Sequence, residues 1–299
     1  MVCAAWTPGS AGANEESIVT AVFAKTHNGY VRELAPDGTP LRETYVVGKG
    51  TYAPGRREDP SIENVPFSGV VRALAPYLAQ KNYVPAPDKQ SADLILVLHW
   101  GTTLPLNDGS YQNVLNMATG AIRNVQNLRM NAAAPMSLAD KELLNVVTRA
   151  AENDLFGDLM LMEMENEARR RANEFNANLL GYIGDVNARV DLAHLAGVGT
   201  AHNDLVGEIE EERYYVVIGA YDFQEVLKGR HKLLWTTRVS IRAQKNRFDE
   251  WLPTMFANAS DYFGEESKRL VRRFQRATKV ELGELKTLGV VDEREMDSK

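Results

Sequence analysis

The sequence has little of several features that would narrow its class. Its single cysteine, Cys3, excludes an internal disulfide and a cysteine cluster that holds a metal ion. No apolar run approaches the ~20 residues that a membrane-spanning helix needs, so we predict no transmembrane segment. The 34 Lys and Arg are outnumbered by 40 Asp and Glu, which argues against a nucleic-acid partner. The remaining composition, 44% hydrophobic and 25% charged, is that of an ordinary globular protein of 299 residues.

Residues 1–13 are small, apolar and uncharged, and a polar stretch follows from Asn14. Ala11-Gly12-Ala13 has the small-x-small form of a signal-peptidase site. A secretory leader also needs a positive start and an apolar stretch, which would have to lie upstream of Met1. Two interpretations stay open: residues 1–13 are the remnant of a signal peptide, or they are a frayed terminus rich in Ala and Gly.

The first hundred residues predict strands and one helix. β-branched and aromatic residues predict a strand over 18–24, and Pro36-Asp37-Gly38 predicts the turn of a hairpin between 30–34 and 41–47. Gly, Pro and charged residues predict a loop over 48–65. Two further elements follow, an amphipathic helix over 67–78 and a strand buried on both faces over 92–100.

The middle of the chain has helical spacing instead. A helix is predicted over about 110–130, and one or two long helices over 138–180, with Gly157 and Gly181 as breaks or ends. Ser137 and Asp140 resemble a capping box at the start of this stretch. On its polar face, Glu165–Arg169 and Glu167–Arg171 are spaced as ion pairs one helical turn apart.

The last third returns to strand patterns. Four elements are predicted there: strands over 213–222 and 231–243 that form a hairpin, a helix over 248–263, and a short helix or turn over 265–274. We therefore predict an α+β fold, a mostly antiparallel sheet with packed helices and a long helical insertion. One discontinuous domain covers 14–288, the insertion covers about 104–211, and a charged tail covers 289–299.

No residue pattern predicts a catalytic site, a metal site or a cofactor. His194 and His202 lie eight residues apart near Asp191 and Asp204, which is not the close spacing of a zinc hydrolase. No Gly-x-Ser-x-Gly elbow is present. The acidic runs 163–167 and 208–212 are interpreted as solvated faces, because paired acid chemistry needs a carboxylate in an apolar pocket.

Aromatic residues are concentrated in the C-terminal third. The first interpretation is a hydrophobic core where the second hairpin meets its helix, since aromatic side chains dominate buried packing. The alternative is an aromatic groove for a ligand or partner, formed by Tyr215, Tyr221, Trp235 and Trp251.

Two stretches carry a resemblance to a known group. The strand Ser91–Leu98 and the hairpin of Tyr215–Asp222 with Leu233–Arg238, which has a Trp near the start of its second strand, resemble a family of bacterial envelope lipoproteins and periplasmic proteins that share a domain of unknown function. The resemblance covers about 67–100 and 213–285, and the helical stretch 104–211 departs from the compact form of that family. It implies a secreted or membrane-anchored protein without enzymatic activity that handles a partner or a surface.

Three functional hypotheses follow. The first is a binding or scaffolding module of the cell envelope, periplasmic or associated with the outer membrane, whose partner is a protein or an envelope component. The second is a hydrolase whose site lies where the insertion packs on the sheet and uses His99, His194 or His202. The third is a cytoplasmic interaction protein that forms a homo-oligomer through the helix 138–180.

Overall fold

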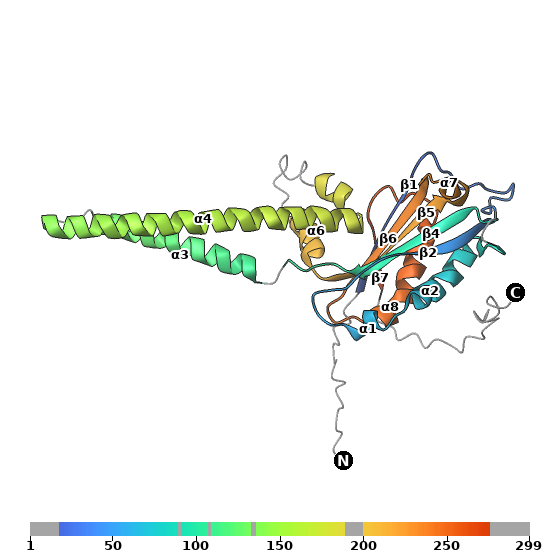
Figure 1. The fold of residues 1–299 in the computed structure, drawn as a ribbon, viewed down its shortest axis with the longest axis horizontal. Helices are drawn as coiled ribbons and strands as arrows, with labels where there is room; N and C mark the ends of the chain where they lie inside the picture. The colour runs from blue at the N-terminus through green and yellow to red at the C-terminus, as the bar shows by residue number, and fades with distance from the viewer. Residues whose placement is uncertain (1–17, 89–90, 107–108, 133–135, 189–199, 276–299) are drawn as a thin grey trace, which may run out of the picture. The chain divides into compact units, whose positions relative to one another are not determined.

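Seven strands form one sheet in the computed structural model of the chain, which describes residues 18–88, 91–106, 109–132, 136–188 and 200–275 (Figure 1). The strands are β1 (Ile18–Thr26), β2 (Glu43–Ala53), β3 (Tyr83–Pro85), β4 (Leu94–Thr102), β5 (Arg213–Asp222), β6 (Leu233–Arg242) and β7 (Val271–Gln275). Their order is β3-β2-β4-β5-β6-β1-β7. β2 pairs in parallel with β3 and β4, and β4, β5, β6 and β1 pair antiparallel, so the predicted α+β class with a mostly antiparallel sheet is confirmed.

The helices of the described residues fall into two groups. Those that accompany the sheet are α1 (Pro60–Glu63), α2 (Phe67–Gln80), α7 (Phe223–Leu227), α8 (Phe248–Ala259) and the short 3-10 helix η1 (Ser260–Tyr262). Those of the insertion are α3 (Ser110–Asn131), α4 (Leu138–Leu180), a helical segment at 183–188, and α6 (Thr200–Glu210). The chain divides into two units, Val19–Arg273 and its two ends; of the ends only Ile18, Phe274 and Gln275 are described.

The hydrophobic core lies between one face of the sheet and the helices α2 and α8 (Figure 1). Side chains alternate between the faces of a strand, so register decides which residues share a face. Leu98 pairs with Ile218, and both are fully buried on the helix-covered face. Leu74 of α2 and Phe256 of α8 are equally buried. Burying each such side chain contributes about 1.5–3 kcal/mol.

The insertion leaves and re-enters the sheet at neighbouring strand ends. β4 and β5 are adjacent antiparallel strands, and the backbone N–H of Thr103 donates to the carbonyl of Arg213 at 2.9 Å. Between them α3 and α4 form an antiparallel helical hairpin (Figure 1). Ser137 caps α4 by accepting from the backbone N–H of Asp140, as predicted. At 43 residues α4 is about 65 Å long.

The two glycines predicted to interrupt α4 behave differently. The helix continues through Gly157 without a break. It ends at Gly181, whose φ of 84° is in the left-handed region that favours glycine. A Cβ on Gly181 would lie 2.4 Å from the Cβ of Phe23 on β1, so glycine also lets the helix end approach the sheet.

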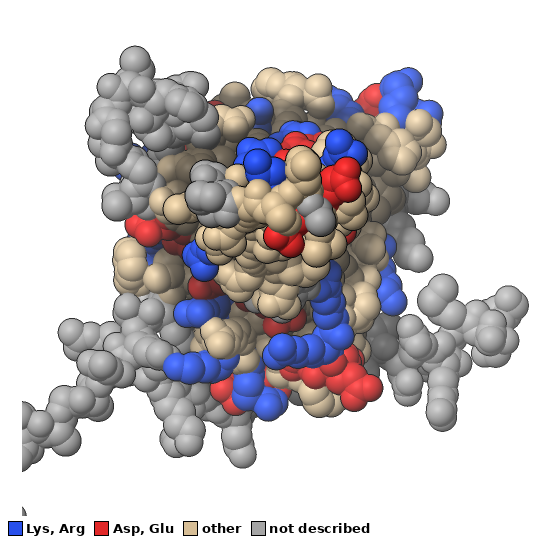
Figure 2. All heavy atoms as spheres, turned by 90° about the vertical axis from the view of Figure 1, so that its left-hand side faces the viewer, with Lys and Arg blue, Asp and Glu red and all other residues tan. Residues whose placement is uncertain are grey.

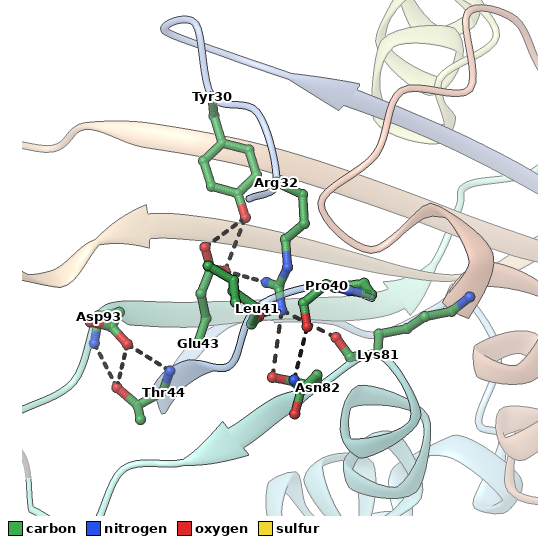
Figure 3. Close-up of polar contacts among 9 residues, drawn as sticks. All are labelled: Tyr30, Arg32, Pro40, Leu41, Glu43, Thr44, Lys81, Asn82 and Asp93. Atoms are coloured by element: carbon green, nitrogen blue, oxygen red, sulfur yellow. Dashed lines mark hydrogen bonds and ion pairs between the residues drawn. The ribbon is translucent and has the colours of Figure 1, made fainter. Parts of the chain in front are cut away.

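The predicted N-terminal hairpin is wrong. The turn exists, but residues 30–34 contribute only an isolated bridge, Leu34 to Pro40, and β2 pairs in parallel with β3 and β4. The side chain of Arg32 turns inward and binds Glu43 and the carbonyls of Leu41 and Lys81 (Figure 3). This segment is therefore held by a buried guanidinium instead of a strand ladder.

The predicted loop over 48–65 is also wrong, because β2 continues to Ala53 and α1 follows. The glycines there serve close packing: a Cβ on Gly50 would lie 2.6 Å from the carbonyl oxygen of Leu98 and 2.7 Å from Nδ1 of His99. The register of β2 against β4 shifts between Lys49 and Tyr52, which marks a bulge at this point.

Two further expectations need correction. Residues 271–275, predicted as part of a short helix or turn, form the strand β7. β4, predicted to be buried on both faces, alternates along most of its length between buried residues and half-buried ones such as Ile95 and Val97. The predictions for residues 1–13 and 289–299 lie outside the described residues.

Candidate functional site

A cavity of about 780 Å³ lies where α4 approaches the ends of β2 and β4. The walls come from three stretches far apart in sequence: residues 53–56 after β2, residues 102–106 after β4, and the C-terminal third of α4. Tyr215 of β5 also lines it. A volume of this size is within the ~300–1,000 Å³ of small-molecule sites in proteins.

The wall that α4 supplies is mainly apolar. Four of its side chains recur at helical spacing on one face: Ala168, Ala172, Phe175 and Leu179. Leu104 and Leu106 also line the cavity. Phe175 is two-thirds exposed, so the apolar wall continues to the cavity mouth. Such a lining suits a ligand with a mainly apolar body.

Charged side chains at the mouth are held by partners on the protein. Arg169 donates through Nε to Glu210 at 2.6 Å, and its guanidinium lies 4.4 Å from the ring centre of Tyr111. Asn173 also donates to Glu210, at 2.7 Å. Glu210 is buried, with 4% of its side chain exposed, so the prediction that the whole run 208–212 is solvated is wrong. The predicted Glu167–Arg171 pair is confirmed, at 2.9 Å. For Arg169, which was predicted to pair with Glu165, the partner found is Glu210. The hydrogen bond to Glu210 raises the pKa of Arg169.

The structure does not place the four aromatic residues of the predicted groove on one surface. Tyr215 lines the cavity, and burial raises the pKa of its phenol. Trp235 pairs with Ala220 in register, which puts it on the opposite, helix-covered face, where it is fully buried and stacks on Phe263. Tyr221 lies beside Gly219 near the far end of β5, and Trp251 is half-buried on α8.

The histidines of the hydrolase hypothesis do not line this cavity. His99 lies on β4, where its Nδ1 accepts the backbone N–H of Thr51 at 3.0 Å, and burial lowers its pKa. His202 lies on α6, and His194 is outside the described residues. Within the cavity lining, Tyr215, Glu165 and three arginines are the only titratable side chains, a set without the histidine that most often transfers protons near neutral pH.

Two searches limited to the described part of the chain gave negative results. No cluster of three or more His, Cys, Asp or Glu side chains there could hold a metal ion. No helix there is both long and apolar enough to cross a membrane.

Comparison of the sequence with protein-family models and with curated proteins finds no match. Function is therefore inferred from the chain's own geometry.

Sequence patterns found one wall of this site and missed the rest. Ala168, Ala172, Phe175 and Leu179 all belong to the apolar face predicted for the helix 138–180. The stretches 53–56 and 102–106 carry no motif, and only the pairing of β2 with β4 brings them together. Buried Glu210 could not be told apart from its half-buried acidic neighbours by composition.

Proposed function

We propose that the chain is a non-enzymatic binding module of the bacterial cell envelope that holds a mainly apolar ligand in the cavity beside α4. The observation that carries this proposal is the apolar wall of α4, which with Leu104 and Leu106 lines a volume suited to a small molecule. The cavity lining supplies shape and apolar surface rather than a paired nucleophile and base, which favours binding over catalysis.

The envelope location rests on the sequence alone. It is supported by the resemblance of residues 67–100 and 213–285 to envelope lipoproteins and by the signal-peptidase-like Ala11-Gly12-Ala13. Reading the DNA upstream of Met1 and fractionating cells that express the native gene test it. We expect an in-frame leader and recovery in the envelope fraction; an in-frame stop just before Met1 together with a cytoplasmic product would contradict the location.

Cavity binding is tested with an apolar fluorescent dye, anilinonaphthalene sulfonate. Ala172→Trp fills the cavity wall, so we expect it to raise the dissociation constant of the dye by at least about tenfold, the loss of roughly 1.4 kcal/mol. Asn124→Trp is the matched control, because Asn124 is exposed on α3 and does not line the cavity.

Titration of dye fluorescence at fixed protein concentration gives both constants, and circular dichroism checks that each variant is folded. Equal dye binding by the wild type and by folded Ala172→Trp would sink the proposal that the cavity is the binding site.

A further inference from the structure

The long helix α4 exposes an unusual amount of apolar side chain. Ten of its large apolar residues each expose a third or more of their surface: Leu138, Leu143, Val146, Val147, Phe156, Leu159, Met160, Leu161, Met164 and Phe175. Seen from the loop end of the hairpin, uncharged side chains make up much of the surface that faces the viewer (Figure 2). Exposed apolar surface of this extent marks an interaction site.

The contact with α3 accounts for a different stripe of the helix. Six less exposed α4 residues at three- and four-residue spacing follow one face: Leu144, Thr148, Ala151, Leu155, Asp158 and Met162. Val125 and Ala118 of α3 are buried against this side of the hairpin, and Arg129 pairs with Glu152 at 2.8 Å. The hairpin therefore satisfies only one of two apolar stripes on α4.

The second stripe has the spacing of a coiled-coil seam. Steps of three and four residues alternate along it without exception, and every position is exposed. We call these ten positions the α4 seam: Asp140, Leu143, Val147, Ala150, Asp154, Gly157, Leu161, Met164, Ala168 and Arg171.

The α4 seam is complementary to itself when its direction is reversed. About a two-fold axis at the seam midpoint, between residues 155 and 156, each residue meets another seam residue of the second copy. The opposed pairs are Leu143 with Ala168, Val147 with Met164, Ala150 with Leu161, and Asp154 with Gly157. In the outer and inner apolar layers a large side chain meets alanine, the alternation that lets two helices interdigitate.

Charge follows the same symmetry. The outermost pair places Asp140 of one copy opposite Arg171 of the other, at both ends of the seam. Arg171 is largely exposed, and among the described residues its one ion pair is with Glu167 of its own helix, so its guanidinium has donors left for a second carboxylate. A parallel pairing in register would instead place Asp140 against Asp140 and Arg171 against Arg171, which is repulsive.

We propose that two copies of this chain pair antiparallel through the α4 seam, so that their hairpins form a four-helix bundle. Over about 32 residues the seam is about 48 Å long, and with a helix width of about 10 Å it covers about 480 Å² on each copy. The total of nearly 1,000 Å² is below the ~1,200 Å² of stable interfaces, the size of a weak, reversible dimer. This interface is isologous, which is the commonest symmetry of homo-oligomers. The last two seam positions, Ala168 and Arg171, also line the cavity, so the second copy lies against the cavity mouth.

Sedimentation velocity of the full chain from about 1 to 100 µM tests the pairing. Leu161→Glu removes a large apolar side chain from the inner apolar layers of both copies and adds a carboxylate next to the layer that holds Asp154, so we expect the dissociation constant of the dimer to rise at least about 100-fold. Phe156→Glu is the matched control, since Phe156 is two-thirds exposed on α4 but lies off the seam, and we expect it to remain dimeric. A wild-type monomer at 100 µM, or a dimer that Leu161→Glu leaves intact, overturns the proposal.

Cross-linking tests the direction without relying on a disruptive variant. In a Cys3→Ser background, a mixture of Ala150→Cys and Leu161→Cys chains should form a disulfide between unlike chains at least about tenfold faster than either chain with itself, because only opposed seam positions bring Cβ atoms within bonding range. Preferential self-linking of the Ala150→Cys chain indicates parallel pairing and overturns the register.

A charge exchange provides the second check on register. Arg171→Asp should weaken the dimer, and combining it with Asp140→Arg should restore it, because the seam then carries the same pair with its charges reversed. Failure of the double variant to recover overturns the placement of Asp140 opposite Arg171.

Discussion

The side chain of His99 on β4 binds β2 at a point where the regular backbone hydrogen bonding between the two strands is interrupted. The bulge in β2 lets the backbone N–H of Thr51 turn toward the imidazole and donate to Nδ1. An accepting Nδ1 carries no proton, so the ring is neutral in this arrangement. The role is structural: the ring takes the place of a backbone acceptor beside Gly50, where a larger residue would clash with it.

This contact predicts a pH dependence of stability. Burial lowers the pKa of His99 below its usual 6.5, so the stabilisation is present above pH 6.5 and is lost as the pH falls through the lowered pKa of the folded state. His99→Asn keeps an acceptor near Nδ1 without a titrating group. When the pH is lowered from 7.5 to 5, we expect the free energy of unfolding to fall by about 1 kcal/mol less in this variant than in the wild type. Thermal unfolding at each pH measures it.

His27 titrates in the same window, because burial and the nearby Lys25 and Arg238 lower its pKa as well. His27→Gln therefore serves as the comparison. The comparison is between His27→Gln and the double variant His27→Gln with His99→Asn. Identical pH profiles of stability for these two proteins would show that the Thr51 contact does not set the pH dependence.

At the scale of residues, sequence patterns located structural roles poorly. Gly48 and Gly50 look like loop glycines in the sequence, yet they allow β2 to lie against Ile95 and His99. A glycine in the sequence shows that the position has no side chain, but it does not show which neighbouring residue packs against that position. The same holds for Arg32, which lies in the predicted strand 30–34 and is instead buried against Tyr83, with its guanidinium 3.7 Å from the ring centre.

At the scale of elements, the long periodic helices were predictable and their partners were not. The spacing of apolar residues predicted α2, α3 and α4 to within a few residues, because tertiary contacts reinforce that spacing over many turns. The short strand β7 was missed, since five residues carry too little periodicity to distinguish a strand from a turn.

The Arg169–Glu210 contact fastens α4 to α6 and predicts a measurable loss. Arg169→Leu leaves the buried carboxylate of Glu210 with Asn173 as its remaining donor, so we expect the free energy of unfolding in urea to fall by about 2–3 kcal/mol. Arg170→Leu is the control, because its pairs with Glu167 and Glu174 are exposed to solvent and we expect their loss to change stability little.

The double variant Arg169→Leu with Glu210→Leu removes both charges together. It should recover most of the loss, since no unpaired carboxylate is left in the interface between the helices. A double variant as unstable as Arg169→Leu alone would mean that packing, and not the charge of Glu210, accounts for the loss.

At the scale of the molecule, the distal half of the hairpin is independent of the sheet. The hydrogen bonds and ion pairs found for the described residues within 125–156 stay inside α3 and α4. Because Arg129 pairs with Glu152, positions 125 and 156 lie opposite each other on the two helices. Replacing 125–156 by a short glycine-rich turn should leave the thermal unfolding midpoint within about 3 °C, a change of about 1 kcal/mol or less.

The same shortened chain removes half of the α4 seam, so it should sediment as a monomer. Circular dichroism and sedimentation velocity measured on one preparation separate the two effects. Loss of the cooperative unfolding transition would show that the distal hairpin supports the sheet after all.

The place where the insertion joins the sheet also has a kinetic consequence. Thr103 and Arg213, which share a hydrogen bond, are 110 positions apart in sequence. Closing a flexible loop of that length costs about 4 kcal/mol of chain entropy. A helical hairpin forms from local contacts and shortens the remaining loop, so once α3 and α4 have paired, part of that entropy has already been lost. The pairing of β4 with β5 is therefore expected to follow the formation of the helical hairpin, and to be faster because the hairpin has already formed.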